Sequence, residues 1–385
     1  CINIVMKKGW IFLLCACLSL RLSHGGGISR LGSRGLFWLF PWSRHSSSSS
    51  KIPLDHGLDN AQKKHEFVSR TKLTGDASTW KGRHFISVAQ LDSSGIELVM
   101  SKAQEMRVLV ESKGGDDRLK GKVLGCVFYE PSTRTSSSMQ AAMIRLGGTY
   151  IRLEKETSSI QKGESFLDTL QCFSVYCDVV ALRHAQEGSS LHAVLEQQAE
   201  TPIINAGDGP DEHPTQALLD LFTIKSELGR VQGLKIAFVG DLLNSRTIHS
   251  LLGLLRHYDW LELHYVAPDS LQIPQKYIDD LNKPGISQYR HSDLESIISD
   301  IDVLYMTRIQ KERFLSLREY DLFKNLYRVD LSSLAHAKPD MIVMHPLPRV
   351  NEISMDVDDD PRAAYFRQMK YGMYMRMAIL CLILE

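Results

Sequence analysis

Short apolar segments alternate with amphipathic segments along most of the chain from Trp80 onward. The apolar run Val123–Phe128 is bounded by polar residues, which predicts a buried strand. After it, apolar residues recur every three or four positions over 135–147, the spacing of one helix face. Gly147-Gly148 predicts the end of that helix, because glycine commonly follows the last helical turn.

This unit of strand, loop and helix recurs in two series, which predicts an α/β protein. The first series continues with strands near 178–182 and 202–206 and helices near 189–200 and 214–228. The second series has strands near 234–240, 261–267, 286–290, 302–307 and 341–345. We expect two doubly wound parallel-sheet domains joined by helices, because alternating strands and helices build parallel sheets that are covered on both faces.

The predicted parts of the chain follow from this pattern. They are a leader over 1–54, a linker over 55–80, domains over 81–214 and 215–360, and a terminal helix over 361–385 that packs back on the first domain. The apolar end of this helix is too short to span a membrane, so we expect it to join the core.

The 385 residues are 43% hydrophobic and 23% charged, which is typical of a globular protein with two domains. This composition excludes a small disulfide scaffold, a collagen-like repeat and a wholly disordered chain. Residues 1–54 carry seven basic and no acidic side chains, whereas residues 55–385 carry 38 basic and 45 acidic ones. An acidic body argues against a nucleic-acid partner, and any anion must be bound by a local arrangement of residues.

The leader has two parts. Met6-Lys7-Lys8 precedes an apolar stretch over 10–20, which has the length of a signal peptide and is too short for a membrane span. An Arg- and Ser-rich stretch without acids follows and ends in five serines at 46–50. This series resembles a bipartite leader and predicts delivery to a plastid-type organelle. Delivery to mitochondria, and a cytoplasmic protein whose upstream residues are not translated, are the alternatives.

Seven cysteines occur without a Cys-x-x-Cys pair or the spacing of metal ligands. We therefore expect no metal site and no cofactor. The four cysteines after the leader are predicted to be buried, reduced thiols, and they are Cys126, Cys172, Cys177 and Cys381.

The most informative segment is 129–136, Tyr-Glu-Pro-Ser-Thr-Arg-Thr-Ser, which lies between a predicted strand and a predicted helix. Its hydroxyl side chains could cap the helix, and the free backbone N–H groups of the first turn favour an anion. Ser132, Thr133, Arg134 and Thr135 add donors suited to phosphate. A capped helix with a surface arginine is the alternative, and the spacing is not that of a Walker P-loop.

Three further loops of the first half carry polar residues. Ser158 and Lys162 lie in a loop where a lysine could close on a ligand, although a solvated lysine is the simpler interpretation. Arg183 follows a strand, and the carboxyl ends of strands are where open α/β sheets bind ligands. His213 and Gln216 flank a helix start and could reach one small ligand, with His213 donating to a carbonyl oxygen or serving only as a cap residue.

In the second half, three loops after strands carry candidate residues. Arg246 follows the first strand, Arg308 and Gln310 follow another, and Leu347-Pro348 lies in the segment His-Pro-Leu-Pro-Arg over 345–349. Two arginines on such loops would suit a substrate with two carboxylates. Leu347 and Pro348 can contribute only their carbonyl oxygens, and Pro348 stiffens the turn.

Together these segments resemble the catalytic chain of the aspartate carbamoyltransferase family. The ordered series is Ser-Thr-Arg-Thr, Lys-Gly-Glu, Arg-His, His-Pro-Thr-Gln, Ser-Arg-Thr, Thr-Arg-Ile-Gln-Lys-Glu-Arg and His-Pro-Leu-Pro-Arg, and the resemblance covers about 84–385. It implies transfer of the carbamoyl group from carbamoyl phosphate to the amino group of L-aspartate, an early step of pyrimidine synthesis. The two domains would then bind carbamoyl phosphate and aspartate, respectively.

The resemblance also implies a role for each residue. The phosphate would be held by Ser132, Thr133, Arg134, Thr135 and Arg183. The carbamoyl carbonyl would be polarised by His213 and Thr135, and the carbamoyl NH₂ would be held by Gln216, Leu347 and Pro348. Aspartate would be bound by Lys162, Arg246, Arg308 and Gln310. Members of the family form homotrimers, so Ser158 and Lys162 would reach into the site of a neighbouring subunit. A regulatory chain, where one exists, is separate and cannot be inferred from this sequence.

Two alternatives stay open. Ornithine carbamoyltransferase shares the fold and the phosphate motif, but that family usually reads His-Cys-Leu-Pro where this chain has His345-Pro346-Leu347-Pro348. An inactive scaffold that binds carbamoyl phosphate is the second alternative. The complete set of expected polar residues argues against it.

Overall fold

The computed structural model describes residues 59–154, 156–196, 201–310, 314 and 316–385. The predicted leader over 1–54 lies outside these residues. So do the last four residues of the helix that was predicted over 189–200, which is observed as α5, Ser189–Glu196.

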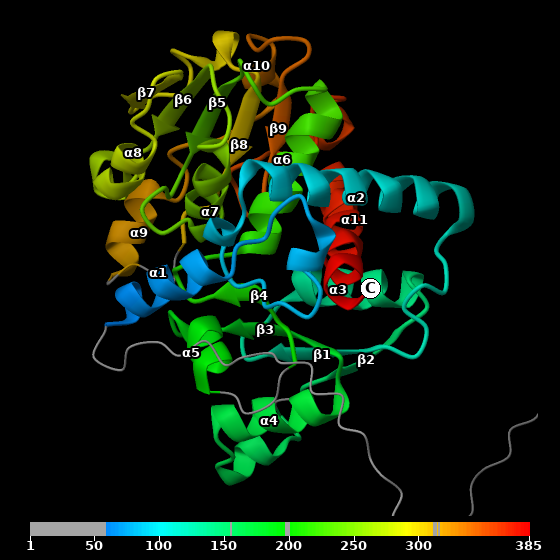
Figure 1. The fold of residues 1–385 in the computed structure, drawn as a ribbon. Helices are drawn as coiled ribbons and strands as arrows, with labels where there is room; N and C mark the ends of the chain where they lie inside the picture. Colours follow the sequence, from blue (N-terminus) through cyan, green and yellow to red (C-terminus); the bar gives the residue numbers. More distant parts are fainter. Residues whose placement is uncertain (1–58, 155, 197–200, 311–313, 315) are drawn as a thin grey trace, which may run out of the picture. The chain divides into compact units, whose positions relative to one another are not determined.

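The first half of the chain forms a four-stranded parallel sheet in the order β2-β1-β3-β4 (Figure 1). Its strands are β1 Val123–Phe128, β2 Thr149–Arg152, β3 Val179–His184 and β4 Ile203–Asp208. The connecting helices are α3 Thr133–Arg145, α4 Phe166–Tyr176 and α5, with the short 3-10 helix η3 Ser159–Lys162 before α4. The strands predicted at 123–128, 178–182 and 202–206 are therefore confirmed.

Strands β1, β3 and β4 of this sheet are buried on both faces, as their apolar sequences predict, whereas the edge strand β2 is largely exposed. Successive side chains of a strand point to opposite faces. Leu124 and Cys126 accordingly share one core cluster with Met139 of α3, whereas Val127 shares another with Leu170 of α4. Figure 1 shows α3 and α4 on opposite sides of the sheet.

The second half forms a five-stranded parallel sheet in the order β7-β6-β5-β8-β9. Its strands are β5 Lys235–Val239, β6 Leu261–Val266, β7 Ile286–His291, β8 Val303–Met306 and β9 Ile342–Met344. Its helices are α7 Arg246–Leu255, α8 Gln275–Asp280, α9 Leu317–Phe323 and α10 Leu331–Leu334. The prediction of two doubly wound parallel sheets is confirmed.

In each sheet the direction of winding reverses once, between β1 and β3 and between β5 and β8. At such a switch point the loops after the two strands leave in opposite directions and open a crevice at the carboxyl edge, where open α/β sheets bind ligands. The segments that follow β1, β5 and β8 carry seven of the fourteen residues that the sequence singles out, and Arg183 lies near the end of β3.

Two helices connect the halves. Helix α6, Pro214–Leu228, follows β4 and leads to β5, and its residues 214–224 are all buried. The terminal helix α11, Tyr365–Leu384, packs against α2 (Ser93–Lys113), α3 and α6. The last helix therefore does return to the first domain, as predicted. None of the helices in the described ranges has the length and apolar character that a membrane span requires.

The linker predicted over 55–80 is wrong for residues 59–80. Asn60–Arg70 forms helix α1, which begins with an Asp59–Gln62 capping box and buries Phe67 and Val68. Trp80 is completely buried. The sequence of α1 is mostly polar, so its short apolar face gives little sign of a helix. This face becomes evident only where it packs in the folded protein.

Two smaller predictions also need correction. Cys172 is exposed, because the buried face of α4 is formed by Thr169, Leu170 and Ser174 and Cys172 lies on its outer side; the other three predicted thiols are buried. Ser132 is the N-cap residue of α3, but its side chain makes no capping hydrogen bond. The anion-binding potential of this helix start therefore does not depend on a hydroxyl cap.

Gly240 follows the last residue of β5 and has a positive φ of 116°. A Cβ at this position would lie 2.3 Å from the carbonyl oxygen of Thr307, so we expect Gly240→Ala to lower the free energy of unfolding by about 3 kcal/mol, through backbone strain and the clash. Gly229 also has a positive φ, 72°, but its Cβ would meet open space. Gly229→Ala should therefore cost only about 1 kcal/mol. Urea unfolding of both full-length variants tests this difference, and equal losses would contradict it.

Candidate active site

The two switch points face one cleft of about 1000 Å³. Twelve of the fourteen residues predicted for the site line it, although they come from distant parts of the sequence. They are Ser132, Thr133, Arg134, Thr135, Arg183, His213, Gln216, Arg246, Arg308, Gln310, Leu347 and Pro348.

The first wall of the cleft is the start of α3. The helix begins at Thr133 after the extended Ser132, so the N–H groups of its first turn and the positive end of its dipole face an anion. Thr135 is buried, and the Arg134 guanidinium donates to the Leu347 carbonyl oxygen at 2.8 Å. Burial and the nearby positive Arg308 lower the pKa of Arg134. An anion would relieve this crowding of positive charge.

His213 is the N-cap residue of α6, and Pro214 occupies the first helical turn as the sequence predicts. The backbone N–H of His213 donates to Ser250 Oγ of α7 at 3.0 Å, and this bond connects the loop to the second half of the chain. Its Nε2 lies 3.4 Å from Thr135 Oγ1. Burial, followed by the positive charges of Arg246 and Arg183, holds the pKa of His213 well below 6.5. The imidazole is therefore neutral at pH 7 and can donate from one nitrogen only.

Arg183 is the last residue but one of β3, and burial, together with the charge of Arg246, lowers its pKa to about 10. Glu130 partly offsets this effect. Its Oε2 lies 3.2 Å from Arg183 Nε and 3.6 Å from Arg246 Nη2, so one carboxylate joins a cation from each half. The neighbouring His184 instead packs against Tyr129 and Phe166.

The wall opposite belongs to the second sheet. Arg246 is the first residue of α7, and its guanidinium also contacts the Gly209 carbonyl oxygen. Gln310 follows β8 and donates to the Asn244 carbonyl oxygen at 3.0 Å. The bond of Gln310 holds the loops after β5 and β8 against each other, whereas the contact of Arg246 reaches the loop after β4 in the first half. The segment 311–313, which belongs to the same motif as Arg308 and Gln310, lies outside the described residues.

The loop after β9 completes the cleft. Leu347 has a left-handed backbone, with φ of 56°, and its peptide bond to Pro348 is cis. The Leu347 N–H donates to His345 Nδ1 at 2.7 Å, and His345 Nε2 lies 2.7 Å from a carboxylate oxygen of Glu352. These bonds set the imidazole tautomer and hold the turn that presents the Leu347 carbonyl oxygen.

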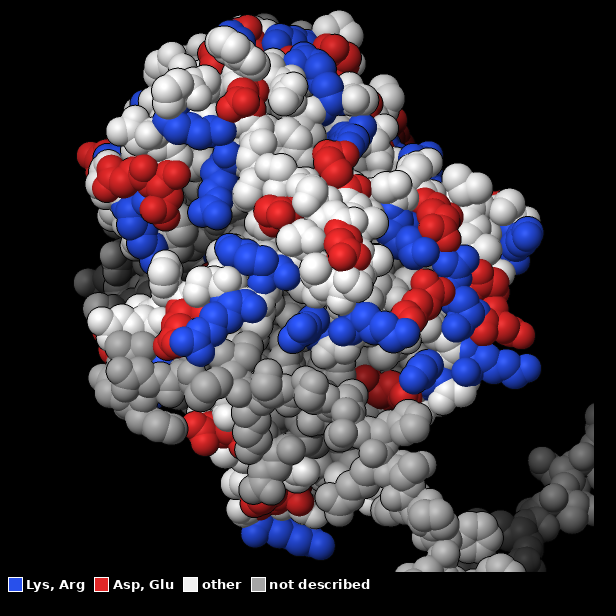
Figure 2. Space-filling view, in the orientation of Figure 1, with Lys and Arg blue, Asp and Glu red and all other residues white. Residues whose placement is uncertain are grey.

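The cleft is strongly positive within an acidic body. Among the described residues that line it, the only acid is Glu130, whereas the cations are Arg134, Arg183, Arg246, Arg308, Arg376 and Lys370. By contrast, residues 55–385 carry seven more acidic than basic side chains. The face drawn in Figure 2 mixes Lys and Arg with Asp and Glu. Positive potential is thus concentrated in the cleft and would attract an anionic ligand.

Two predicted residues, Ser158 and Lys162, do not line this cleft. They lie at the ends of the loop before α4, where Lys162 is exposed in the last turn of η3. Their own chain therefore does not bring them to the site.

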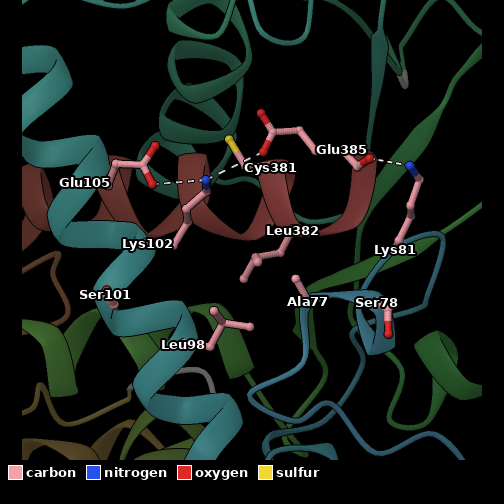
Figure 3. A pocket seen from close by; sticks show the side chains of 10 residues that line it. All are labelled: Ala77, Ser78, Lys81, Leu98, Ser101, Lys102, Glu105, Cys381, Leu382 and Glu385. Carbon is pink, nitrogen blue, oxygen red and sulfur yellow. Dashed lines mark hydrogen bonds and ion pairs between the residues drawn. The ribbon is translucent and has the colours of Figure 1, made fainter.

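A second cavity, of about 380 Å³, lies between η1 (Ala77–Thr79), α2 and α11 (Figure 3). Its two lysines are already paired, because Lys81 contacts the Glu385 carbonyl oxygen and Lys102 lies 3.1 Å from Glu105 and 3.6 Å from the Glu385 carboxylate. This cavity therefore lacks the excess of cations over acids that the described residues lining the cleft have. The described residues also contain no group of three or more His, Cys, Asp or Glu side chains that could hold a metal ion.

The sequence interpretation missed Glu130 and the buried Asp220. Glu130 lies inside the most informative motif, but nothing in its spacing shows which arginines it contacts. Asp220 left a clearer signal, since it is a single acid within the apolar helical run Ala-Leu-Leu-Asp-Leu-Phe and lies four residues after Gln216.

The fold and the cleft define a two-domain α/β protein with a positively charged cleft between its sheets. Two family models match it in succession, the carbamoyl-phosphate-binding domain of aspartate/ornithine carbamoyltransferases over residues 83–226 and their aspartate/ornithine-binding domain over 232–383. The aspartate carbamoyltransferase catalytic subunit of Methanocaldococcus jannaschii is 46% identical over 304 residues, which are 79% of this chain and 98% of that protein. The chain belongs to the aspartate/ornithine carbamoyltransferase family.

Other relatives are much longer. A multifunctional protein of Dictyostelium discoideum is 50% identical over 320 residues, which are 83% of this chain but 14% of that protein. The chain spans 13–17% of the length of five such multifunctional relatives.

Solved structures agree with these matches. The aspartate transcarbamoylase of Trypanosoma cruzi in complex with N-(phosphonacetyl)-L-aspartic acid superposes with a TM-score of 0.76 at 43% identity, covering 80% of this chain and 98% of that one. The same enzyme with carbamoyl phosphate and aspartate also gives 0.76 at 43% identity, covering 82% and 100%.

Proposed function

We propose that the protein transfers the carbamoyl group of carbamoyl phosphate to the amino group of L-aspartate, giving N-carbamoyl-L-aspartate and phosphate for pyrimidine synthesis. The observation that carries this proposal is that the start of α3, which is suited to phosphate, and arginines from the second sheet line the same cleft. The substrates named for the similar Trypanosoma cruzi enzyme support it.

Each wall of the cleft then has one task. The start of α3 and Arg183 bind the phosphate, and Arg246, Arg308 and Gln310 bind the aspartate carboxylates. The neutral His213 and Thr135 donate to the carbamoyl oxygen, while Gln216 and the carbonyl groups of Leu347 and Pro348 accept from its NH₂. The residues that would bind the two substrates come from both halves of the chain, so the site is complete only where the halves meet.

The reaction requires a deprotonated aspartate amine. Its nitrogen bonds to the carbamoyl carbon and the carbonyl oxygen gains negative charge, which the donors on that wall stabilise. The bond from carbon to the phosphate oxygen then breaks, and the leaving phosphate takes up the amine proton. Positioning and charge stabilisation account for this catalysis without a covalent intermediate on the protein.

A product assay on the full-length chain tests the proposal. Labelled carbamoyl phosphate is offered with aspartate, with ornithine and with both, and the products are identified by mass spectrometry. We expect carbamoyl aspartate alone. Carbamoylation of ornithine alone would establish the ornithine alternative, and tight binding of carbamoyl phosphate without any product would establish the inactive scaffold.

We also propose that the protein is a homotrimer in which Ser158 and Lys162 complete a neighbouring site. The proposal is supported by the position of both residues outside their own cleft. Full-length Lys162→Ala and Arg134→Ala chains should each be nearly inactive. After dissociation and mixing in equal amounts, about a quarter of the shared sites would combine both intact residues, so activity should return. Mixed trimers, verified by light scattering, that stay inactive would contradict shared sites.

For the leader we propose delivery to a plastid-type organelle, supported by the basic, acid-free composition of residues 1–54. Fractionation of cells that express the tagged full-length chain tests this. An unprocessed chain found uniformly in the cytoplasm would contradict it.

A further inference from the structure

A buried carboxylate lies directly behind the carbamoyl end of the cleft. Asp220 of α6 is completely buried and follows Gln216 by one helical turn, which places both side chains on one face of the helix. Its Oδ1 accepts from Gln216 Nε2 at 2.8 Å and from Gln368 Nε2 at 2.6 Å, and its Oδ2 accepts from the Tyr305 hydroxyl at 2.7 Å. One carboxylate therefore joins α6, α11 and β8.

This contact sets the direction of the Gln216 amide. A carboxylate oxygen can only accept, so the Gln216 NH₂ must point toward Asp220. Its carbonyl oxygen is then the end of the amide that is left for the cleft, which Gln216 lines. The ligand consequently meets an acceptor at this position, and not a donor.

The acceptor role of Oδ1 does not depend on the charge of Asp220. Burial raises the pKa of Asp220 to about 7, against the effect of the three donors and of the nearby Arg376. A proton taken up at pH 7 can reside on Oδ2, where the Tyr305 hydroxyl oxygen can accept it. Oδ1 keeps both amide donors in either state.

A second arm leads from Asp220 to the loop after β9. The Gln368 NH₂ donates to Asp220, so its carbonyl oxygen faces away and accepts the His345 N–H at 3.0 Å. His345 Nδ1 in turn accepts the Leu347 N–H at 2.7 Å. The orientation of the turn that presents the Leu347 carbonyl oxygen is thus connected, bond by bond, to the same carboxylate.

We infer that Asp220 is a positioning residue that makes the cleft specific for an acyl phosphate carrying an NH₂ group. It does so by directing acceptors, the Gln216 carbonyl and the loop of Leu347, at the ligand nitrogen. The inference rests on the proposed function, because it assigns the NH₂ to a carbamoyl group. An analogue with a methyl group in that place, such as acetyl phosphate, leaves buried acceptors unpaired, and sites of this kind reject such analogues strongly.

Equilibrium binding to the full-length chain tests the inference, with carbamoyl phosphate and acetyl phosphate as the two probes. The wild-type chain should prefer carbamoyl phosphate by at least about tenfold, the effect of one hydrogen bond to a ligand. In Asp220→Leu, which has a similar size but no acceptor, no group fixes the direction of the Gln216 NH₂, and its amide can turn round. The preference should then fall about tenfold, mainly through weaker binding of carbamoyl phosphate.

Tyr305→Phe is the matched control, since it removes a donor from Oδ2 and leaves the contact of Gln216 with Oδ1. Its ratio of the two affinities should stay within about twofold of the wild type. Equal losses for both probes in Asp220→Leu, or a wild-type chain that binds them equally, would overturn the inference. The comparison on the wild-type chain remains valid even if Asp220→Leu does not fold. Because binding is measured without aspartate, a chain that makes no carbamoyl aspartate refutes the proposed function separately.

Discussion

Arg134→Ala is expected to lower kcat by about 10³-fold, the upper range for the loss of one preorganised donor to developing charge. Arg134 stands in the first turn of α3, half-buried, with its guanidinium held by the Leu347 carbonyl oxygen at 2.8 Å. The positive Arg308 and burial already disfavour its charge, so a phosphate dianion gains more here than at an exposed arginine. The alanine variant leaves the charge of the departing phosphate unpaired at this point.

Steady-state turnover of the full-length variant, with saturating carbamoyl phosphate and aspartate, measures this effect. Arg145→Ala is a suitable control, because Arg145 ends the same helix and its guanidinium binds the Gly114 carbonyl oxygen outside the cleft. It should turn over like the wild type. Arg134→Lys should recover only part of the loss, since an ammonium lacks the planar, two-pronged geometry of guanidinium. Near wild-type turnover in Arg134→Ala would refute the assigned role.

The strands and the chemistry of this protein could be predicted from sequence, but the arrangement of the strands could not. Apolar runs such as Val123–Phe128 mark strands because a sheet covered on both faces needs apolar side chains on both. The order β2-β1-β3-β4 depends on pairings between distant segments, which no local period encodes. The switch points, and hence the position of the cleft, become visible only in the folded chain.

The same reason separates the site residues that were predicted from those that were missed. Arg183 and Arg246 are recognisable because they follow strands, where ligands bind. Glu130 matters because it lies between these two arginines, and Asp220 because Gln216, Gln368 and Tyr305 converge on it. Such roles arise from long-range contacts. Helix α1 was missed for a related reason, since its short apolar face is buried only against the rest of the fold.

His213→Ala is expected to lower kcat by about 10²-fold, because the variant loses a donor to the carbonyl oxygen on which charge develops. The wild-type imidazole should supply this donor without titrating near neutral pH. Burial is the largest of the effects that hold the pKa of His213 well below 6.5, and the positive charges of Arg246, Arg183 and Arg376 lower it further. A lowered pKa means that the ring stays neutral as the pH falls through 6.5. Protonation of His213 should therefore not reduce activity between pH 8 and pH 6.

Two measurements on the full-length chain examine this expectation together. The imidazole NMR signals that disappear in His213→Ala should keep constant shifts from pH 8 to pH 6, and the dependence of wild-type kcat on pH should show no step assignable to them. His192→Ala is the control for turnover, because His192 lies exposed on α5 outside the cleft, and it should keep wild-type kcat. A His213 signal that titrates near 6.5 would mean that water reaches the imidazole, and that the donor would be partly an imidazolium ion at neutral pH. Unchanged turnover in His213→Ala would instead place the stabilisation of the oxyanion on Thr135 alone.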